Sequence, residues 1–415
     1  MGKNERYMAP LWWVPTLYFA EGVPYFLVTS VSVTLFAQLG VPNGKMALFT
    51  SLITLPWVLK PLWSPFVDVI KTKRWWVLAM QAVMAIAVAG VAFSASWSFG
   101  LTLVFFAITA FASATHDIAA DGYYMLALEE KQQAAYVGLR STFYKIANIF
   151  CQSALLVIAG WLQQRTSVSA SWRYVLLGCS GLIAAMAVWH SAALRPDAGN
   201  MVATGHSRRA IWREAGETFA SFFRKKGIGL ALAFMLLYRL PEALLLKLCN
   251  PFFLAETERG GLGLDVATVG EIYGIGVVLM LAGGILGGLI VSRWGLKRTF
   301  MPLALWLTLP CAVYVYLAAC QPAAVWLIAL CIGVEQLGYG LGYTICMVYM
   351  MRFADGQHKT AHFSLCTAFM FLGLMLPGLA AGYIEQATGY LGFFWTVMAC
   401  CVPSVGVAWL VKRSL

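Results

Sequence analysis

Twelve apolar runs, each about as long as a bilayer is thick, constrain this chain more than any other feature. Of its 415 residues, 60% are hydrophobic and only 11% are charged, and the mean hydropathy is +0.75. A soluble domain of this size has no core large enough to hide so much apolar surface. We therefore predict an all-α membrane protein whose twelve transmembrane helices cover approximately 10–39, 46–67, 75–95, 98–126, 134–160, 172–194, 228–254, 266–291, 299–319, 323–351, 359–383 and 389–411.

The distribution of Lys and Arg predicts how these helices are oriented. Loops on the side of the N-terminus hold twenty of the 29 basic residues, the opposite loops hold four, and the spans hold five. Cytoplasmic loops of membrane proteins carry such an excess. We therefore expect a multi-pass membrane protein with both termini and the central linker in the cytoplasm. The net charge of +11 reflects this topology, and we expect no nucleic-acid partner.

One long polar segment divides the apolar runs into two groups of six. We predict an N-terminal six-helix bundle over 1–194, a cytoplasmic linker over 195–227 and a C-terminal six-helix bundle over 228–415. The linker stretch 208–223 alternates charged and aromatic residues, which favours an amphipathic helix on the membrane surface. The first and seventh spans each place a tyrosine, a carboxylate and a proline near mid-membrane, so we expect the two bundles to be pseudo-symmetric.

The seventh span carries a cation, a helix-breaking proline and an anion inside an apolar run. These are Arg239, Pro241 and Glu242, and Arg239 lies about 17 Å from the start of its helix, close to the midplane. An ionised group there costs several kcal/mol unless it faces a partner or a water-filled cavity. Two interpretations are open: a structural ion pair at i,i+3 spacing, or a site for a solute or proton.

Two further carboxylates, Glu21 in the first span and Glu335 in the tenth, lie near mid-depth. Glycine or proline follows each of them, and we expect these residues to loosen the helices and expose carbonyls beside a water-filled cavity. Together with Glu242 they are our candidate proton carriers. Aromatic residues near the charged sites are expected to stack on a sugar ring or bond its hydroxyls: Tyr18, Tyr25, Tyr123, Tyr124, Tyr339 and Tyr343. Tyr238, next to Arg239, is a further candidate residue of the solute site.

A second group of charges lies nearer the cytoplasmic ends of the spans. Asp117 and Asp121 are one helical turn apart on one face, so we expect one of them to hold a proton. Asp68 is placed to latch the two halves together on the cytoplasmic side. One interpretation of this group is a gate. The other is that its members form structural ion pairs or only set the orientation of the helices in the membrane. Its members are Lys60, Asp68, Asp117, Asp121, Arg140, Lys145 and Arg293.

Several motifs resemble known transporters. The loop over 288–298 resembles the cytoplasmic loop motif of the major facilitator superfamily, with Ser292 where Asp is usual. Within that superfamily, the stretches 60–68, 117–121, 238–242 and 335–342 resemble the AmpG muropeptide permease and acetyl-coenzyme A transporter family. The resemblance implies a major facilitator fold and proton-linked uptake of peptidoglycan fragments. Glu21 and His116 depart from the residues usual in that family, which leaves the exact solute open.

Taken with the resemblance, these observations predict a proton-coupled symporter that imports a muropeptide-like or amino-sugar saccharide by alternating access. The alternatives are an exporter of drugs or metabolites with the same fold, uptake of an acyl-coenzyme A or an oligosaccharide, and a non-transporting membrane sensor. The sequence contains no catalytic constellation and no nucleotide-binding loop, so we expect no enzyme activity, no metal and no cofactor. The expected partners are a small-molecule solute, protons and the lipid bilayer, and we expect a monomer.

Overall fold

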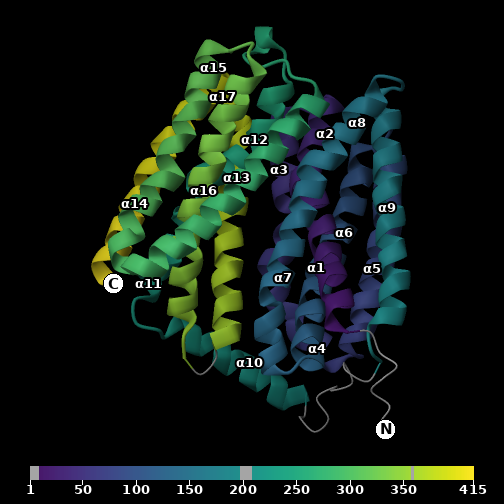
Figure 1. Cartoon of the computed structure of the whole chain (residues 1–415), viewed down its shortest axis with the longest axis vertical. Helices are drawn as coiled ribbons and strands as arrows, with labels where there is room; N and C mark the ends of the chain where they lie inside the picture. The colour runs from purple at the N-terminus through teal and green to yellow at the C-terminus, as the bar shows by residue number, and fades with distance from the viewer. Residues whose placement is uncertain (1–8, 197–207, 357–358) are drawn as a thin grey trace. The chain divides into compact units, whose positions relative to one another are not determined.

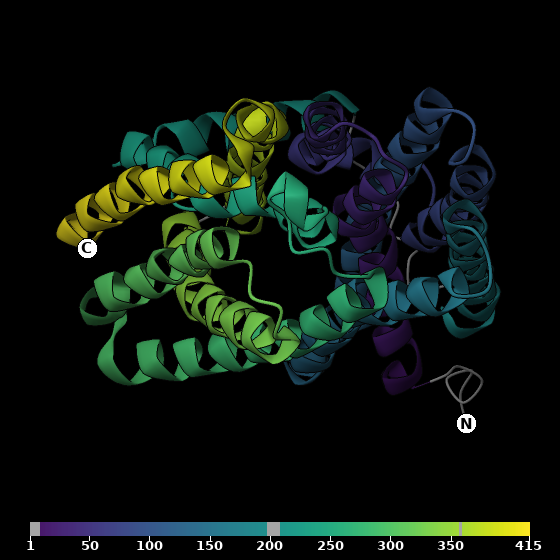
Figure 2. The same cartoon turned by 90° about the horizontal axis from the view of Figure 1, so that it is seen from above.

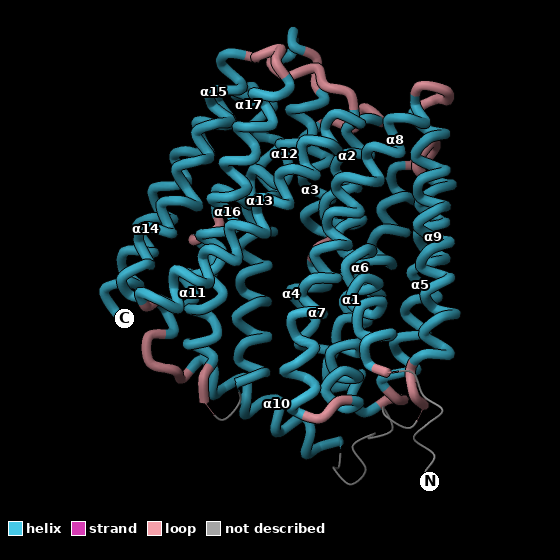
Figure 3. Tube along the Cα trace, in the orientation of Figure 1, coloured by secondary structure: helices cyan, strands magenta, loops and turns pink. Residues whose placement is uncertain are grey.

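The computed structural model describes residues 9–196, 208–356 and 359–415, and these ranges are helical apart from short turns and contain no strand (Figures 1 and 3). The α-helices are α1 (Pro10–Phe26), α2 (Ser32–Gln38), α3 (Asn43–Leu52), α4 (Leu55–Val69), α5 (Lys73–Ser94), α6 (Phe99–Ala127), α7 (Glu130–Ile149), α8 (Leu155–Gln163), α9 (Val168–Ala193), α10 (Arg208–Phe223), α11 (Ile228–Leu237), α12 (Leu240–Leu254), α13 (Val266–Trp294), α14 (Leu296–Thr308), α15 (Ala312–Cys320), α16 (Val325–Ala354) and α17 (Lys359–Ser414). Two π-helical turns, Leu27–Val31 and Phe150–Ala154, interrupt the first and fifth spans, and short 3₁₀ turns cover Thr257–Arg259 and Leu309–Cys311.

Eleven helical segments of the described residues are long and apolar enough to cross a membrane. One of them, Ala361–Ser414, has 54 residues, whereas about 20 are enough for one crossing. Gly389 lies within it at φ 68° and ψ 174°, a left-handed conformation that ends one helix and lets the next begin. Counted as two crossings, this segment completes the twelve that the sequence predicts.

The chain forms two compact units. Unit 1 comprises 1–31, 59–151 and 161–215, and unit 2 comprises 32–58, 152–160 and 216–415. Unit 2 therefore includes two segments from the first half of the sequence, and the division into bundles at 1–194 and 228–415 stays a prediction. The linker stretch 208–223 is the helix α10, as predicted, while the linker residues 197–207 lie outside the described ranges.

Within unit 1, α5 packs along α6 and α9, and α1 packs against α7 and α6. Its core is aromatic where α1 meets α6: the rings of Trp13 and Tyr123 meet edge to face, as do those of Tyr18 and Tyr124. Within unit 2, α13 packs along α16, while α17 packs against α12, α3 and α11 (Figures 1 and 2). α1, α6 and α7 in unit 1, and α12 and α16 in unit 2, therefore each pack against other helices of their own unit.

The glycines of the tenth span do not loosen it, contrary to our expectation. α16 is a continuous helix of 30 residues. A Cβ atom on Gly340 would collide with the carbonyl of Met280 on α13, and one on Gly338 would collide with the carbonyl of Trp306 on α14. These glycines are therefore needed for the close approach of neighbouring backbones, which membrane helices achieve with small residues.

Candidate solute and proton sites

The seventh span is broken at its charged residues. α11 ends at Leu237 and α12 begins at Leu240, so Tyr238 and Arg239 lie between two helices. Pro241 lies in the first turn of α12, where its missing N–H needs no partner. The Ser404 hydroxyl of α17 donates to the Tyr238 carbonyl, which gives that oxygen a side-chain donor inside the unit. Arg239 therefore lies at an interruption between two helices, within the apolar segment Ile228–Leu254.

Arg239 is held by three hydrogen bonds from its guanidinium. It donates to both carboxylate oxygens of Glu242, with Nε 2.7 Å from Oε2, and it donates from Nη2 to the Tyr339 hydroxyl at 2.9 Å. The guanidinium also lies 4.9 Å from the ring centre of Tyr343, in a cation–π contact. The side chains of Arg239 and Glu242 are only 7% and 12% exposed. The result is a desolvated, bidentate ion pair flanked by two tyrosines.

Two further predicted residues of the solute and proton site, Tyr238 and Glu335, also belong to unit 2. Their hydrogen bonds are formed with groups other than this ion pair. Tyr238 is fully buried, stacks on Phe234 and donates to the carbonyl of Gly342, which are the contacts of a core residue. Glu335 on α16 is 7% exposed and accepts hydrogen bonds from Tyr314 at 3.3 Å and from Gln336 at 2.9 Å. Glu335 is thus a second buried carboxyl group of unit 2, with neutral partners.

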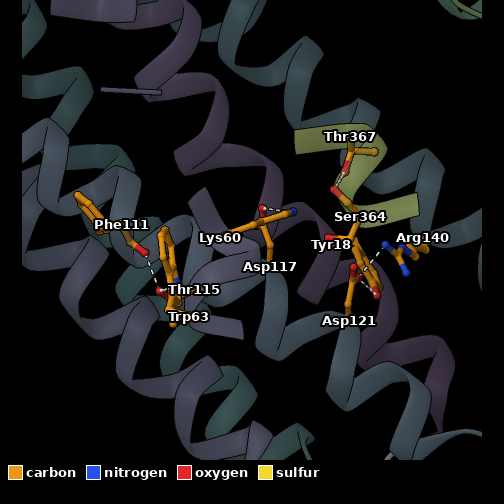
Figure 4. A network of polar contacts seen from close by, with 10 residues as sticks. All are labelled: Tyr18, Lys60, Trp63, Phe111, Thr115, Asp117, Asp121, Arg140, Ser364 and Thr367. Carbon is orange, nitrogen blue, oxygen red and sulfur yellow. Dashed lines mark hydrogen bonds and ion pairs between the residues drawn. The ribbon is translucent and has the colours of Figure 1, made fainter. Parts of the chain in front are cut away.

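In unit 1, three predicted residues meet at one ion pair (Figure 4). Arg140 on α7 lies 2.7 Å from Asp121 on α6, and Tyr18 on α1 donates to the same carboxylate at 3.0 Å. The Arg140 guanidinium also lies 4.3 Å from the centre of the Tyr18 ring. The side chains of this pair are 32% and 39% exposed, so the pair is much less buried than Arg239 and Glu242.

Asp117 has a different cation from Asp121. It pairs with Lys60 of α4 at 3.8 Å (Figure 4). The two aspartates share one face of α6, and each has its own positive neighbour. That one of them holds a proton stays a prediction. Glu21 is buried nearby on α1, where Asp117, Asp121, Arg140 and Lys60 all act on its charge. Its Oε2 atom has no hydrogen-bond partner, a state that suits a protonated carboxyl group better than a carboxylate.

The remaining members of the predicted gate are Lys145, Arg293 and Asp68. Lys145 on α7 is half-buried and forms no ion pair with the described residues. Arg293 is exposed in the last turn of α13. Asp68 lies in α4, but its side chain is outside the described part of the structure. The latch that we predicted for Asp68 therefore stays a prediction.

Sequence reasoning missed a buried polar network in unit 1. The Gln81 amide on α5 lies 3.0 Å from His116 Nε2 and 2.9 Å from His190 Nδ1, and Nε2 of His190 lies 3.0 Å from the Thr16 hydroxyl. Gln81 and both histidines are fully buried. A glutamine and a histidine inside apolar runs were the available signal, because buried polar groups need partners. In unit 2, Tyr314 was missed in the same way.

Comparison with known proteins shows which family models, relatives and solved structures the chain is similar to. The model of the BT1 family matches residues 21–309, and that of the Major Facilitator Superfamily matches residues 242–414. The anhydromuropeptide permease of Escherichia coli (strain K12) is 24% identical, over 96% of this chain and 79% of its own. The solved nucleoside transporter NupG has a TM-score of 0.73 at 14% identity, covering 98% of this chain and 100% of its own. A D-xylose–proton symporter has a TM-score of 0.68 at 13% identity, covering 95% and 96%. These likenesses confirm the predicted major facilitator fold.

Proposed function

The chain belongs to the BT1 family, and from this premise we propose that it is a proton-coupled importer of a muropeptide-like or amino-sugar saccharide. It works by alternating access between two six-helix bundles in a bacterial inner membrane, with both termini in the cytoplasm. The similarity to an anhydromuropeptide permease supports this solute class, and the excess of basic residues in one set of loops supports the orientation.

The observation that carries the proposal is the Arg239 cluster at the break in the seventh span. A guanidinium offers planar, bidentate recognition of an acidic group, and two tyrosines beside it offer a ring face and hydroxyls for a sugar. An ion pair with only a structural role requires neither a helix break nor two tyrosines beside it. An acidic saccharide as the solute accounts for the guanidinium, the helix break and the tyrosines together.

The same cluster supplies a route for coupling. Both carboxylate oxygens of Glu242 already accept hydrogen bonds from Arg239, so an acidic solute has to replace Glu242 as the partner of the guanidinium. Glu242 then loses its cation in a desolvated place and takes up one proton, which keeps the net charge of the cluster unchanged. Release of the solute reverses the exchange: Glu242 gives up the proton and returns to Arg239. One solute anion and one proton therefore travel together.

Glu21 is our second proton-carrying group, in unit 1. Its unpartnered Oε2 suits the protonated form, and the ion pairs of Asp117 and Asp121 surround it with charges that a change of conformation rearranges. Glu335, with its neutral donors, is the third candidate. We assign the Asp121–Arg140 pair to the cytoplasmic side because its exposure fits contact with water.

Binding is the direct test of the solute class. Purified protein is mixed with an acidic amino-sugar disaccharide and with its neutral reduced-acid analogue, and thermal unfolding is followed. A ligand at 100 times its Kd stabilises the native state by about 2.7 kcal/mol. We expect a rise in melting temperature with the acidic sugar only, and its loss in Arg239→Met. Equal shifts with both sugars, or an unchanged shift in the variant, would refute the role of Arg239.

A further inference from the structure

Lys247 is a basic residue of the seventh span that the proposed solute site does not use. It lies on α12, seven residues before the helix ends at Leu254, and is therefore about 10 Å from that end. The residue is only 6% exposed. Its Nζ atom donates a hydrogen bond to the Thr50 carbonyl at 3.1 Å, and it forms no ion pair with the described residues. A lysine buried in a bilayer span without a carboxylate requires an explanation.

The Thr50 carbonyl is available because the second span is broken next to it. In a continuous helix the amide of Thr54 would donate to that oxygen, but here it donates to the Ser51 carbonyl at 3.0 Å. α3 ends at Leu52 and α4 begins at Leu55. Lys247 of α12 thus bonds the carbonyl that the break in the second span leaves without a helical donor.

α17 closes the space around this amine. A Cβ atom on Gly378 would lie 2.5 Å from Ser51 Oγ and 3.3 Å from Cε of Lys247, so the helix backbone is pressed against both side chains. Ser51 Oγ is buried and has no hydrogen-bond partner. An ammonium group has three donors, and this packing supplies an acceptor for one. The contact therefore accommodates a neutral amine and leaves an ammonium group largely unsatisfied.

Charged groups on the surrounding helices do not compensate Lys247. Lys45 on α3 and Glu271 on α13 are exposed, and Glu385 lies two turns along α17 from Gly378, where it accepts a hydrogen bond from Asn43 at 2.8 Å. The described part of α2 contains no charged residue. On α12 itself, Glu242 is bound to Arg239. The charge state of Lys247 is therefore governed by whether α3 covers it.

We propose that Lys247 is a proton-binding site that is empty while α3 packs against α12 and α17, and filled when α3 separates from them. Separation admits water to the amine, which then takes a proton from solvent. Return of α3 requires that this proton leave to water before the contact closes. The proposal concerns unit 2 alone and does not depend on which solute is carried.

The proposed coupling between proton binding at Lys247 and the separation of α3 has a definite size and sign. If one proton binds only to the separated state, the ratio of separated to packed α3 rises by up to tenfold for each unit by which pH falls. This holds over the range in which the exposed amine is protonated and the covered amine is not. At higher pH the packed contact dominates; at lower pH it opens.

Hydrogen–deuterium exchange of the purified full chain tests this. Protection of the backbone amides in α3 is measured between about pH 5.5 and about pH 8.5 and is corrected for the intrinsic exchange rate at each pH. In the wild type we expect protection to fall by up to tenfold per unit of decreasing pH. In Lys247→Met, which keeps the apolar stem without the amine, we expect protection that does not change with pH. Lys45→Met, on the exposed end of α3, serves as the matched control and should behave like the wild type.

Three results would overturn the proposal. One is wild-type protection without any dependence on pH. Another is a Lys247→Met variant whose pH dependence equals that of the wild type. The third is a pH dependence that survives in Lys247→Met but disappears in Glu385→Gln, because it would assign the proton to the Glu385–Asn43 contact.

Discussion

A double-mutant cycle on Arg239 and Glu242 separates the two interpretations of the charged break in the seventh span. Both side chains are nearly buried and share two hydrogen bonds, so removal of either one leaves the other as an unpaired charge. For a buried pair this costs about 3–5 kcal/mol. We expect Arg239→Met and Glu242→Gln each to lower the melting temperature clearly, and the double variant to be destabilised by less than the sum, with a coupling of about 3 kcal/mol.

The assay follows tryptophan fluorescence of purified protein during heating, with solute uptake measured on the same variants. The charge-swapped double variant, Arg239→Glu with Glu242→Arg, is the informative control, because it keeps a pair but moves the guanidinium. We expect it to recover stability and to stay inactive in uptake. Additive destabilisation would refute the energetic coupling of the pair, and a swapped variant with normal uptake would show that the pair is only structural.

Three further predictions follow from single contacts. Glu21→Gln removes the titratable group of α1, and we expect it to keep solute exchange while losing accumulation driven by a proton gradient; normal accumulation would contradict this. Tyr343→Leu removes a cation–π contact worth about 0.5–2 kcal/mol and should weaken solute binding by roughly 2- to 30-fold in a titration, whereas Tyr343→Phe should change it little. Asp265 caps α13: burial raises the pKa of its carboxyl group, but hydrogen bonds from Thr268 and Ala267 outweigh burial and lower it. Asp265→Ala should therefore cost about 1 kcal/mol of stability at neutral pH, and the difference from wild type should vanish as pH falls through the lowered pKa.

Much of the fold follows from the sequence because the bilayer leaves few choices. Apolar runs must become helices, and the structure begins and ends the seventh span at Ile228 and Leu254 as predicted. The break at Arg239 was also predictable, since Pro241 has no N–H to continue the helix. The glycines of α16 were misread because glycine permits both loosening and close packing, and only the neighbouring backbones decide between them.

The sequence supplies candidate site residues but not their partners. Residue types and depth made Arg239, Glu242, Asp121 and Arg140 candidates, and only the structure shows that Asp117 pairs with Lys60 and Asp121 with Arg140. Ion pairs between helices depend on rotation and tilt, which apolar periodicity does not specify. The polar residues of the network around Gln81 stand out in the sequence, but their contacts with one another could not be predicted for the same reason.

The most direct test of the central claim is uptake of a labelled amino-sugar disaccharide into liposomes that contain the purified protein, with and without an imposed pH gradient. We expect accumulation above equilibrium when the outside is more acidic, and loss of that accumulation when a protonophore collapses the gradient. Uptake at the same rate and to the same level with the gradient collapsed would contradict proton coupling.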